Sequence, residues 1–495
     1  MNKRYIGITI GPIFDTICDA TSPAALWFSS FFFSNITKKI CEKLCDSKEL
    51  GEVVIYSPYY DKEISLSDGV GKFHDRIICS VSEYRKEVLD KIVDEVKIDM
   101  VEAFPREKMH LEKSQIEEFL KSYLQILYVV KEDIEQENCI LELSPYLDAI
   151  ELIKTVPKVG TINVFQKLFM GDLSGENKNV NIKESDLYLC VDNHQLKRKD
   201  GNIKSIEEIA MDEDSRLKYQ KYFAVINADG DNMGNILKSL KSDDEILGFS
   251  KLCLEYAEKA SELIKNYGGI TIYAGGDDLL FLAPVQHRGK TIFDLCKEIN
   301  TIFVESFSVK YKELIENSCN KPTVSFGVSV QYYKYPLYEA INNSRKLLWH
   351  AKDVEKNPKK NCIAFNLQKH SGQSVDMIIS NNDLDKINEL LVFGNDAANV
   401  QSVMYAISDF RTLFELMDKN AKEGTKSEEG YQNYEKIWCN LFDNACQEYA
   451  MEYIKGICRI YYFSFLFEQE QEESLNKLFT ILKIKKFLVE KEGDK

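Results

Sequence analysis

Two acidic turns are the parts of the sequence best suited to chemistry, because each directly follows an apolar run. The run over residues 223–228 leads into the motif Asp229-Gly230-Asp231-Asn232-Met233-Gly234. The run over residues 270–274 leads into a four-residue turn, Gly275-Gly276-Asp277-Asp278. If the two runs form neighbouring strands, Asp229 and Asp277 lie together at one end of a sheet.

Carboxylates that converge in this way repel one another unless a cation lies between them. Mg²⁺, or the similar Mn²⁺, prefers hard oxygen ligands and usually keeps substrate phosphates in its coordination shell. Two such ions can hold the attacking and the leaving oxygen of a phosphoryl displacement. The spacing therefore predicts a divalent-metal site on Asp229 and Asp277. A large separation between them, or a lysine counter-ion in place of the metal, would leave only an assembly role.

Three further features of the same region suit a nucleotide. Gly275 and Gly276 can adopt positive φ and let a backbone or a phosphate come close. A helix is expected to begin near Gly234, where free N–H groups can receive a triphosphate. Lys352 can reach the same phosphates as a point charge. Each feature alone is also typical of ordinary surface structure, and it is their combination that favours a site.

The elements that must position these residues follow from the apolar pattern between residues 216 and 370. Strands are predicted at residues 222–228, 270–274, 279–283, 322–330 and 362–366. Helices are predicted at residues 246–265, 290–315 and 336–352. This order predicts an antiparallel sheet with helices packed on one face.

The flanking stretches carry less chemistry. Residues 1–100 predict half of a ferredoxin-like sheet, with a helix that begins at Ser22-Pro23 and ends near Leu44. Its strands are predicted at residues 5–10, 53–56 and 76–81. Residues 101–215 predict a mainly helical insert, with one helix over Glu112–Val130 and polar loops at 171–182 and 193–202.

In the last stretch, residues 375–495 contain no convincing strand and predict a small helical bundle. Its helices are predicted at residues 384–391, 402–417, 431–451 and 474–488. This stretch contains no recognisable catalytic or ligand-binding motif, and we infer a docking role for it.

The composition limits the class of protein. Among 495 residues, 63 Lys and Arg stand against 79 Asp and Glu, a net charge of −16, which argues against unaided nucleic-acid binding through a strongly basic surface. The 13 cysteines show no CxxC spacing, so a reduced, cytoplasmic protein without a zinc ribbon is expected. No apolar run approaches the ~20 residues that span a membrane, and the N-terminal run is predicted to be a strand rather than a signal peptide.

At the two acidic turns the chain resembles a known family. The motifs at 229–234 and 275–278 resemble the palm polymerase motifs of the large catalytic subunit of type III CRISPR effector complexes (the Cas-ten family), in particular its Cmr, or type III-B, branch. Further matches within residues 216–372 are Thr323-Val324-Ser325-Phe326-Gly327-Val328, Tyr335-Pro336-Leu337, Ala351-Lys352 and Lys369-His370-Ser371-Gly372. A weaker resemblance, to the family's first, degenerate palm, covers residues 1–100 through Ile10-Gly11-Pro12 and Leu26-Trp27-Phe28. The segment 216–372 also resembles diguanylate cyclase domains, whose palm has the same order of strands and helices.

The resemblance implies a fold and an activity. The fold is α+β, with two ferredoxin-like palm domains (1–100 and the active 216–372), a helical insert (101–215) and a C-terminal helical domain (373–495). The active palm would join nucleotides by attack of a 3′-hydroxyl on the α-phosphate of ATP, releasing pyrophosphate. The product would be an antiviral second messenger, either a cyclic oligoadenylate or AMP joined to S-adenosylmethionine. The implied partners are the other type III subunits, with guide RNA and target RNA held through the complex.

The resemblance also implies residue roles. Asp229 and Asp277 would hold the metals, with Asp278 and Asp231 in support. Ser325 would lie near a base or ribose, and Lys352 near the triphosphate. The other motif positions expected to contact the nucleotide are Gly230, Asn232, Gly234, Gly275 and Gly276.

The sequence departs from the family in two places. Many members begin with an HD nuclease domain, whereas this chain starts at the palm-like strand and His74-Asp75 is its only His-Asp pair. We therefore expect no DNA cleavage, and His74 is expected to be structural or adjacent to substrate. Many relatives also hold zinc between the palms, which Cys190 and His194 cannot do alone.

Two other functions stay open on the sequence. A stand-alone cyclase of the diguanylate type would act without RNA. A scaffold subunit whose palm has lost catalysis would bind partners only, although the intact Asp229, Asp277 and Asp278 argue against it.

Overall fold

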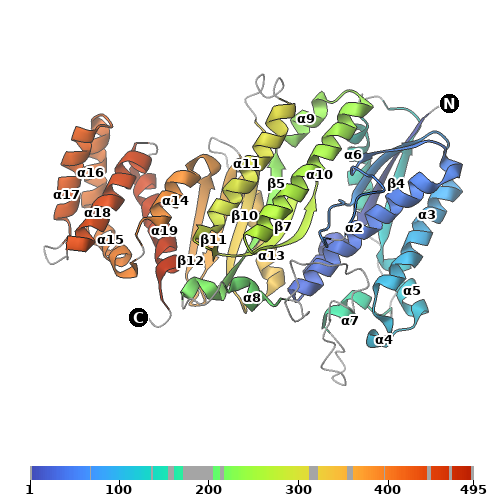
Figure 1. Ribbon diagram of the computed structural model, residues 1–495, viewed down its shortest axis with the longest axis horizontal. Coiled ribbons are helices and arrows are strands. Elements are labelled where there is room, and N and C mark those ends of the chain that lie inside the picture. The colour runs from blue at the N-terminus through green and yellow to red at the C-terminus, as the bar shows by residue number, and fades with distance from the viewer. Residues whose placement is uncertain are drawn as a thin grey trace.

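Two larger β-sheets and a helical unit follow one another along the molecule (Figure 1). The computed structural model describes residues 3–66, 68–134, 138–153, 161–170, 204–211, 217–311, 321–353, 360–394, 396–442, 448–467 and 471–491. The predicted loops at 171–182 and 193–202, with Cys190 and His194, lie outside these described residues. The sheets and helices confirm the α+β class.

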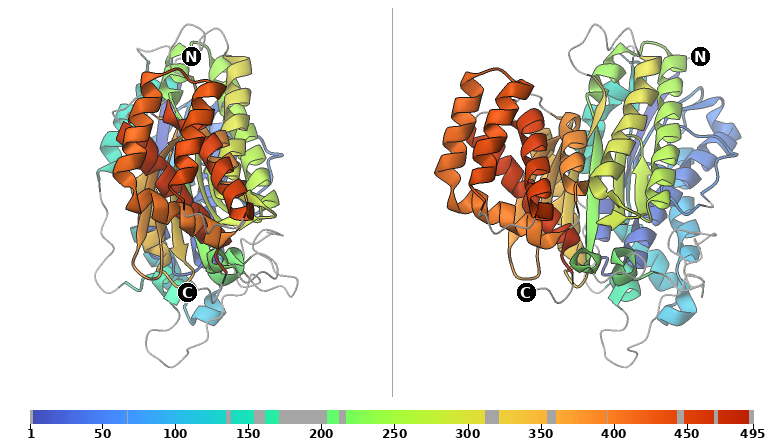
Figure 2. Two further views of the ribbon diagram at one scale, coloured as in Figure 1. Left: turned by 90° about the vertical axis from the view of Figure 1, so that its left-hand side faces the viewer. Right: turned by 60° about the vertical axis from the view of Figure 1, so that its left-hand side comes forward.

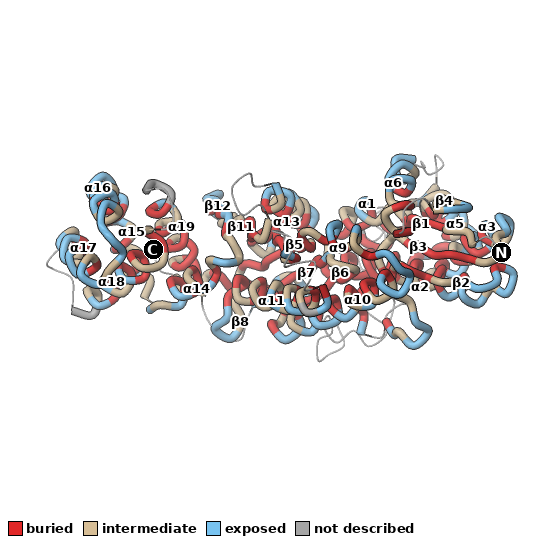
Figure 3. The backbone as a smooth tube through the Cα atoms, turned by 90° about the horizontal axis from the view of Figure 1, so that it is seen from above, coloured by how far each residue is buried: buried red, intermediate tan, exposed pale blue. Residues whose placement is uncertain are grey.

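The first sheet has four antiparallel strands in the order β2-β3-β1-β4. The strands are β1 (Arg4–Gly11), β2 (Val53–Ser57), β3 (Arg76–Val81) and β4 (Gln125–Lys131). The accompanying helices are α1 (Ile13–Cys18), α2 (Pro23–Asp46), α3 (Lys86–Asp99), α4 (Arg106–Met109), α5 (Lys113–Tyr123), α6 (Cys139–Glu151), α7 (Val164–Met170) and α8 (Ile206–Ala210). α2 and α6 lie on opposite faces of this sheet (Figure 3).

Local sequence signals explain most of this unit. The three predicted strands and the helix from residue 23 are confirmed. The Ser22 hydroxyl accepts a hydrogen bond from the Ala25 N–H at 3.2 Å, which caps the first turn of α2, and Pro23 follows it. α2 is buried on nearly all sides because its aromatic run packs against the sheet and against Phe104 and Phe165.

The predicted helix over Glu112–Val130 is wrong in its second half. α5 ends at Tyr123, and β4 then pairs with β1 from Gly11↔Gln125 to Tyr5↔Lys131. A short apolar run fits a helix or a strand, and here pairing with a distant strand decides between them. The first sheet therefore takes its fourth strand from beyond residue 100.

The second sheet has six strands in the order β12-β11-β10-β5-β7-β6. They are β5 (Tyr222–Asp231), β6 (Ile270–Gly275), β7 (Asp278–Pro284), β10 (Thr323–Tyr332), β11 (Cys362–Gln368) and β12 (Ser374–Ser380). The helices of this unit are α9 (Met233–Ser239), α10 (Asp243–Asn266), α11 (Ile292–Lys310) and α13 (Leu337–Lys352). The predicted strands and helices are present, except that the helix predicted over 290–315 begins at Ile292, after the short strand β9 (Lys290–Thr291), and that residues 312–315 lie outside the described part of the chain.

The prediction of an antiparallel sheet with helices on one face is wrong in two respects. β10 and β11 run parallel, because α13 connects them as a crossover. α13 also covers the face opposite α10 and α11 (Figure 3), which lie side by side on the other face (Figure 2). The sheet is therefore covered by helices on both faces.

Gly327, in the middle of β10, lets α13 approach this face closely. A side-chain carbon at Gly327 would lie 2.0 Å from the Ser344 carbonyl oxygen and 2.3 Å from the Leu348 backbone nitrogen. Real carbon atoms do not approach backbone atoms so closely, so the helix can occupy this position only over a glycine.

The C-terminal unit is helical, except that β12 precedes it. β12 (Ser374–Ser380) contradicts the prediction of no strand over residues 375–495. Its buried residues, Val375, Met377 and Ile379, alternate with exposed ones, so a period of two was present in the sequence. The helices are α14 (Leu384–Val392), α15 (Ala397–Asp409), α16 (Arg411–Glu423), α17 (Glu428–Asn440), α18 (Glu448–Tyr461) and α19 (Gln471–Val489). The single helix predicted over 402–417 is wrong, because α15 and α16 are separated at Phe410.

Asp418 of α16 gives this unit a pH-dependent stability. Its buried carboxylate accepts hydrogen bonds from the Tyr434 and Tyr461 hydroxyls, each at 2.6 Å. Burial outweighs these bonds and raises the pKa of Asp418 to about 6 from an ordinary 3.8. Because the folded state holds the proton more tightly, stability falls as pH rises through this window, by up to about 3 kcal/mol.

We expect Asp418→Asn to remove that pH dependence. The amide stays neutral, and its oxygen can still accept a hydrogen bond. Urea unfolding of the variant at pH values across the range from about 4 to about 6 should show a flatter stability profile than the wild type. An unchanged slope would show that another group titrates.

The first and second sheets share one hydrophobic cluster. Phe223, Val225 and Leu282 of the second sheet belong to the same cluster as Ile6 and Ile8 of β1.

The two units are also joined through the backbone. The Ala274 N–H donates to the Gly71 carbonyl oxygen at 2.9 Å, and Gly71 forms an isolated parallel bridge with Tyr273. The loop before β3 is thus bound to β6, the strand that leads into the second acidic turn.

Among the described residues, no helix is long and apolar enough to cross a membrane.

Candidate active site

The two acidic turns meet at one end of the second sheet. β5 pairs with β7 up to Ala228↔Leu279, so the turn between β6 and β7 lies beside the end of β5. A side-chain carbon at Gly230 would lie 2.7 Å from both the Cβ and the Oδ2 atom of Asp277. Asp277 therefore packs directly over Gly230, next in the chain to Asp229. The structure brings together the two turns that the sequence placed together.

The turn itself is a tight hairpin. Gly275 pairs with Asp278 across it, and Gly276 has a φ of 70°, in the left-handed region that favours glycine. The structure gives positive φ to Gly276 but not to Gly275. The glycine at 276 thus closes the turn that presents Asp277.

The carboxylates of Asp277 and Asp278 have raised pKa values because they lose solvation and are crowded together with Asp229. Loss of solvation and the Asp229 charge raise the pKa of Asp277 to about 7 from an ordinary 3.8. Partial loss of solvation and the neighbouring Asp277 also raise the pKa of Asp278. Both carboxylates are therefore held with too little compensating positive charge, which is the situation that a bound cation relieves.

Lys352 supplies one counter-charge. Its ammonium group, at the end of α13, forms an ion pair with Asp229 Oδ2 and donates to the Gly230 carbonyl oxygen at 3.2 Å. It was predicted near the triphosphate, whereas here it lies on a carboxylate. A lysine counter-ion at this position is the feature expected of a subunit with only an assembly role.

Asp277 and Asp278 are the two carboxylates of this site that suit a divalent metal ion. Among the residues that the structure describes, no group of three or more His, Cys, Asp or Glu side chains is already arranged as a metal site. Asp277 and Asp278 have no ion-pair partner within the described residues, and their raised pKa values report uncompensated charge. Hard, unpaired oxygen donors of this kind suit Mg²⁺ or Mn²⁺.

Asp231 has a different environment from its neighbours. It is fully buried and accepts hydrogen bonds from Thr323 Oγ1 at 2.8 Å, from Ser325 Oγ at 2.8 Å and from the Asn361 N–H at 2.9 Å. Ser325 is also fully buried. These contacts join β5, β10 and the start of β11. Direct contact of Asp231 or Ser325 with a nucleotide stays a prediction.

The rest of the first motif forms the predicted helix start. Asn232 has a φ of 65° and donates from its amide to the Lys321 carbonyl oxygen at 3.0 Å. α9 begins at the next residue, as expected. Space around Gly234 is open, since a side-chain carbon there would meet no atom within 4 Å. A role for Asn232, Gly234 or Gly275 in binding phosphate stays a prediction.

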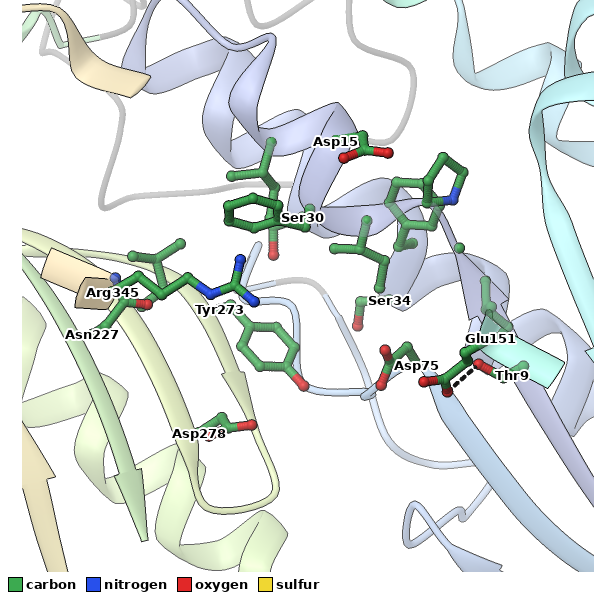
Figure 4. A pocket seen from close by; sticks show the side chains of 18 of the residues that line it. Thr9, Asp15, Ser30, Ser34, Asp75, Glu151, Asn227, Tyr273, Asp278 and Arg345 are labelled. Carbon is green, nitrogen blue, oxygen red and sulfur yellow. Dashed lines mark hydrogen bonds between the residues drawn. The ribbon is translucent and has the colours of Figure 1, made fainter. Parts of the chain in front are cut away.

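A cavity of about 800 Å³ adjoins the site (Figure 4). It lies between the two sheets, and Asp278 is part of its wall. Sequence reasoning did not identify the residues that the cavity takes from the first unit and from α13. Among them are Thr9, Asp75, Glu151 and Arg345. Only the packing of two units together places them side by side, so no local motif could have found them.

His74 fits the structural expectation. Its Nε2 lies 3.0 Å from Ser57 Oγ, and the Arg76 N–H donates to its Nδ1 at 3.4 Å. Burial, with the nearby Arg76 charge, lowers the pKa of His74 to about 4, so the ring is neutral at pH 7. The neighbouring Asp75, not His74, lines the cavity.

The region that contains the two acidic turns is also similar in sequence to known proteins. Residues 222–364 match the family model of the Cas10/Cmr2 second palm domain. The Cmr2 subunit of the Pyrococcus furiosus CRISPR Cmr system is 30% identical over 185 residues, which is 31% of this chain and 19% of the relative. The Cmr2 subunit from Saccharolobus solfataricus is 32% identical over 105 residues, which is 19% of this chain and 10% of the relative. The matched stretch thus spans less than a fifth of either relative.

Solved structures share the fold over most of the chain. A type III-B Cmr-beta complex in the apo state matches with a TM-score of 0.54 and 12% identity, covering 90% of this chain and 78% of that one. A Csm1–Csm4 cassette in complex with cA4 matches with a TM-score of 0.53 and 12% identity, covering 99% and 70%. The same cassette in complex with one ATP matches with a TM-score of 0.52 and 12% identity, covering 99% of this chain and 70% of that one. Residues 222–364 are therefore similar to a Cas10/Cmr2 second palm domain, and most of the chain shares the fold of the Cmr and Csm structures.

Proposed function

We propose that the acidic end of the second sheet transfers AMP from ATP in a reaction that depends on Mg²⁺ or Mn²⁺. The observation that carries this proposal is the packing of Asp277 over Gly230 beside Asp229. Solved relatives of the same fold hold ATP or cA4, which supports a nucleotide substrate. The product would be an adenylate second messenger, either a cyclic oligoadenylate or AMP joined to S-adenosylmethionine.

The chain's residues would divide the work between holding and positioning. Asp229, Asp277 and Asp278 would hold the metal, which when bound neutralises charge on the phosphates and orients the attacking oxygen. Gly230 and Gly276 allow the two turns to come close. Asp231, through its three hydrogen bonds, fixes β5 against β10.

The transfer itself is balanced without any oxidant or reductant. A ribose 3′-hydroxyl oxygen of the acceptor bonds to the α-phosphorus of ATP. The bond from that phosphorus to the bridging oxygen breaks, and pyrophosphate leaves with the electron pair. The hydroxyl proton leaves to water. The protein's contribution is position and charge neutralisation.

We also propose that the activity belongs to a multisubunit, RNA-guided antiviral complex. The first sheet would be a degenerate, ferredoxin-like palm, which is supported by its order β2-β3-β1-β4 with a helix after β1 and another after β3. The helical insert and the C-terminal helical domain would carry partner contacts. Guide RNA and target RNA would act on the palm through the complex.

The test is product formation by the assembled complex. The complex is incubated with labelled ATP, with and without Mg²⁺ and target RNA, and the products are identified by mass spectrometry. We expect an adenylate product only when ATP, metal and target RNA are all present. Equal activity of the isolated chain without RNA would favour a stand-alone cyclase of the diguanylate type. No product and no Mg²⁺-ATP binding would contradict catalysis.

One observation favours a second candidate, a catalytically inactive scaffold subunit. Lys352 already neutralises Asp229, so the site can persist without a metal. In a scaffold this ion pair would be permanent. In the enzyme it would open, and the ammonium would move to the triphosphate when metal and nucleotide bind.

Lys352→Met separates these two candidates. Removing the competing cation should tighten Mn²⁺ binding to the nucleotide-free protein by about tenfold, and it should lower adenylate formation because the triphosphate loses a contact. Mn²⁺ binding can be followed by electron paramagnetic resonance. Lys346→Met is the matched control, because Lys346 is exposed on the same helix. Unchanged Mn²⁺ affinity in Lys352→Met would favour the scaffold.

A further inference from the structure

Two asparagines, Asn361 and Asn381, bind the first acidic turn to the end of the neighbouring strand pair. Asn361 directly precedes β11 and Asn381 directly follows β12, and the pairing of these strands places the two residues side by side. The Asn361 N–H donates to Asp231 Oδ2 at 2.9 Å. The Asn361 carbonyl oxygen accepts from the Asn381 N–H at 2.9 Å, and Asn361 Oδ1 accepts from Asn381 Nδ2 at 2.8 Å. These two residues form an asparagine clasp that ends on Asp231.

The asparagine clasp also contacts β10. Asn381 Nδ2 donates to the Val324 carbonyl oxygen at 2.8 Å. Val324 is paired with Gly230 in the sheet, and Gly230 is the residue over which Asp277 packs. The clasp therefore reaches the first acidic turn directly through Asp231, and it reaches the contact between the two turns through the backbone of β10.

The backbone at the clasp is strained. Lys360 has a φ of 69° and Asn361 a φ of 53°, so two successive residues other than glycine lie in the left-handed region. Asparagine tolerates this region better than most residues do, whereas lysine rarely adopts it. Such a conformation persists only where the surrounding contacts determine it. Here those contacts are the hydrogen bonds of the clasp, and the strained conformation directs the Asn361 N–H at Asp231.

Asn381 connects the clasp to the C-terminal helical unit. It begins a single 3₁₀ turn, Asn381–Asp383, that leads directly into α14. Asp383 accepts from Lys477 of α19 at 2.6 Å, and this ion pair is largely shielded from water, with side chains 18% and 11% exposed. α19 also lies beside β12 (Figure 1). The last helix of the chain is thus fixed two residues from the clasp.

We propose that Asn361 and Asn381 are positioning residues of the candidate active site, and that the C-terminal helical unit holds the first acidic turn in place through them. The inference rests on the proposed function, because it concerns the geometry of the same carboxylates. Metal and phosphate must be held to within a fraction of an ångström for the transfer, so a small shift of the turn lowers the rate. A partner subunit that displaces α14 or α19 would act on the acidic site through Asp383 and Asn381.

Asn381→Ala tests the clasp in the assembled complex. The substitution removes the donor to Val324 and to Asn361 but leaves every candidate metal ligand in the chain. We expect turnover at saturating ATP to fall about tenfold, the KM for ATP to change little, and Mn²⁺ binding to the nucleotide-free chain to weaken about threefold. Asn382→Ala is the matched control, because Asn382 is the next residue and is exposed. Wild-type turnover and Mn²⁺ affinity in Asn381→Ala, or an equal loss in Asn382→Ala, would overturn the proposal.

Asn361→Gly is a second variant that keeps the backbone conformation. Glycine adopts a φ of 53° without strain, so the N–H bond to Asp231 can remain while the acceptor for Asn381 Nδ2 is lost. Hydrogen exchange of the folded chain, without substrate or metal, gives the readout. Amides of residues 228–234 should exchange faster in Asn361→Gly and in Asn381→Ala than in the wild type or in Asn382→Ala. Lower overall stability with unchanged exchange at these amides would make the clasp merely structural and would contradict the proposal.

Lys477→Met tests the connection to the helical unit. It removes the ion pair with Asp383 and leaves both asparagines unchanged. We expect faster exchange at residues 228–234 and a turnover about threefold below that of the wild type. Lys483→Met, on the same helix, is the control and should change neither. If Lys477→Met destabilises the helical unit but leaves exchange at the acidic turn unchanged, the unit does not act on the site.

The failure of this inference and that of the proposed function have different outcomes. If the complex forms product and Asn381→Ala forms it at the wild-type rate, the positioning role fails and nucleotidyl transfer stands. If the wild-type complex forms no product from ATP, but exchange at residues 228–234 depends on Asn381 and Lys477, the positioning role stands and the transfer fails.

Discussion

Replacing Asp277 and Asp278 together by asparagine should abolish adenylate formation while leaving the protein at least as stable as the wild type. The two carboxylates are the members of the candidate metal site that have no ion-pair partner within the described residues. Asparagine keeps their shape but removes the charge that would hold a divalent ion, so we expect a loss of about a hundredfold or more in rate.

The stability readout follows from the sign of the pKa shifts. A carboxylate whose folded pKa lies above its ordinary value destabilises the fold once it ionises. For Asp277 this cost develops between an ordinary 3.8 and about 7, so stability of the wild type falls with pH in that window. In the double variant the decrease in stability over the same pH range should be smaller, because neither asparagine ionises. Thermal unfolding at several pH values, combined with product analysis, checks both expectations. Wild-type activity in the double variant would show that the site is misassigned.

Gly327→Ala should be among the most destabilising single changes in the chain. The new carbon would lie 2.0 Å from the Ser344 carbonyl oxygen, so α13 must move away from β10 or the strand must distort. Overpacking against backbone of this kind costs about 3 kcal/mol or more. Since α13 ends at Lys352, the shift should also disturb the ion pair with Asp229.

Gly234→Ala is the matched control for stability. Its position lies in the first turn of α9, where a side-chain carbon meets no atom within 4 Å. We expect it to be neutral, or to stabilise by about 0.5 kcal/mol through the helix preference of alanine. Urea unfolding of both variants measures the contrast. Equal stability of Gly327→Ala and the wild type would show that the helix can move at little cost.

The sequence predicted the local part of the site well. A strand followed by Asp-Gly-Asp, and a hairpin built on Gly-Gly-Asp-Asp, are short-range patterns, so Asp229 and Asp277 could be placed at one sheet end before any coordinates. The burial of Asp231 and Ser325 could not be foreseen, because their partners come from β10 and from the segment before β11. The ion pair of Lys352 with Asp229 could not be foreseen either, because it depends on how closely α13 packs, and contact of Lys352 with a triphosphate stays a prediction.

The errors in the fold have the same cause. β4 was predicted as helix because its partner β1 lies more than a hundred residues earlier in the chain. The parallel pairing of β10 with β11 and the placement of α13 on the opposite face depend on the crossover, which a list of elements does not specify. The cavity is lined by residues of both sheets, so no local sequence pattern around Asp75 could have indicated that it lines a cavity.

The bridge between Gly71 and Tyr273 has a consequence for anyone who isolates the second sheet. β6 is an outermost strand, and in the intact chain the Gly71 loop of the first unit occupies part of its free edge. Expressed without residues 3–134, the second sheet would present a long, bare template to its own copies. Edge-to-edge self-association, rather than loss of the acidic turns, would then explain an inactive fragment, and the catalytic unit to purify is the pair of sheets together.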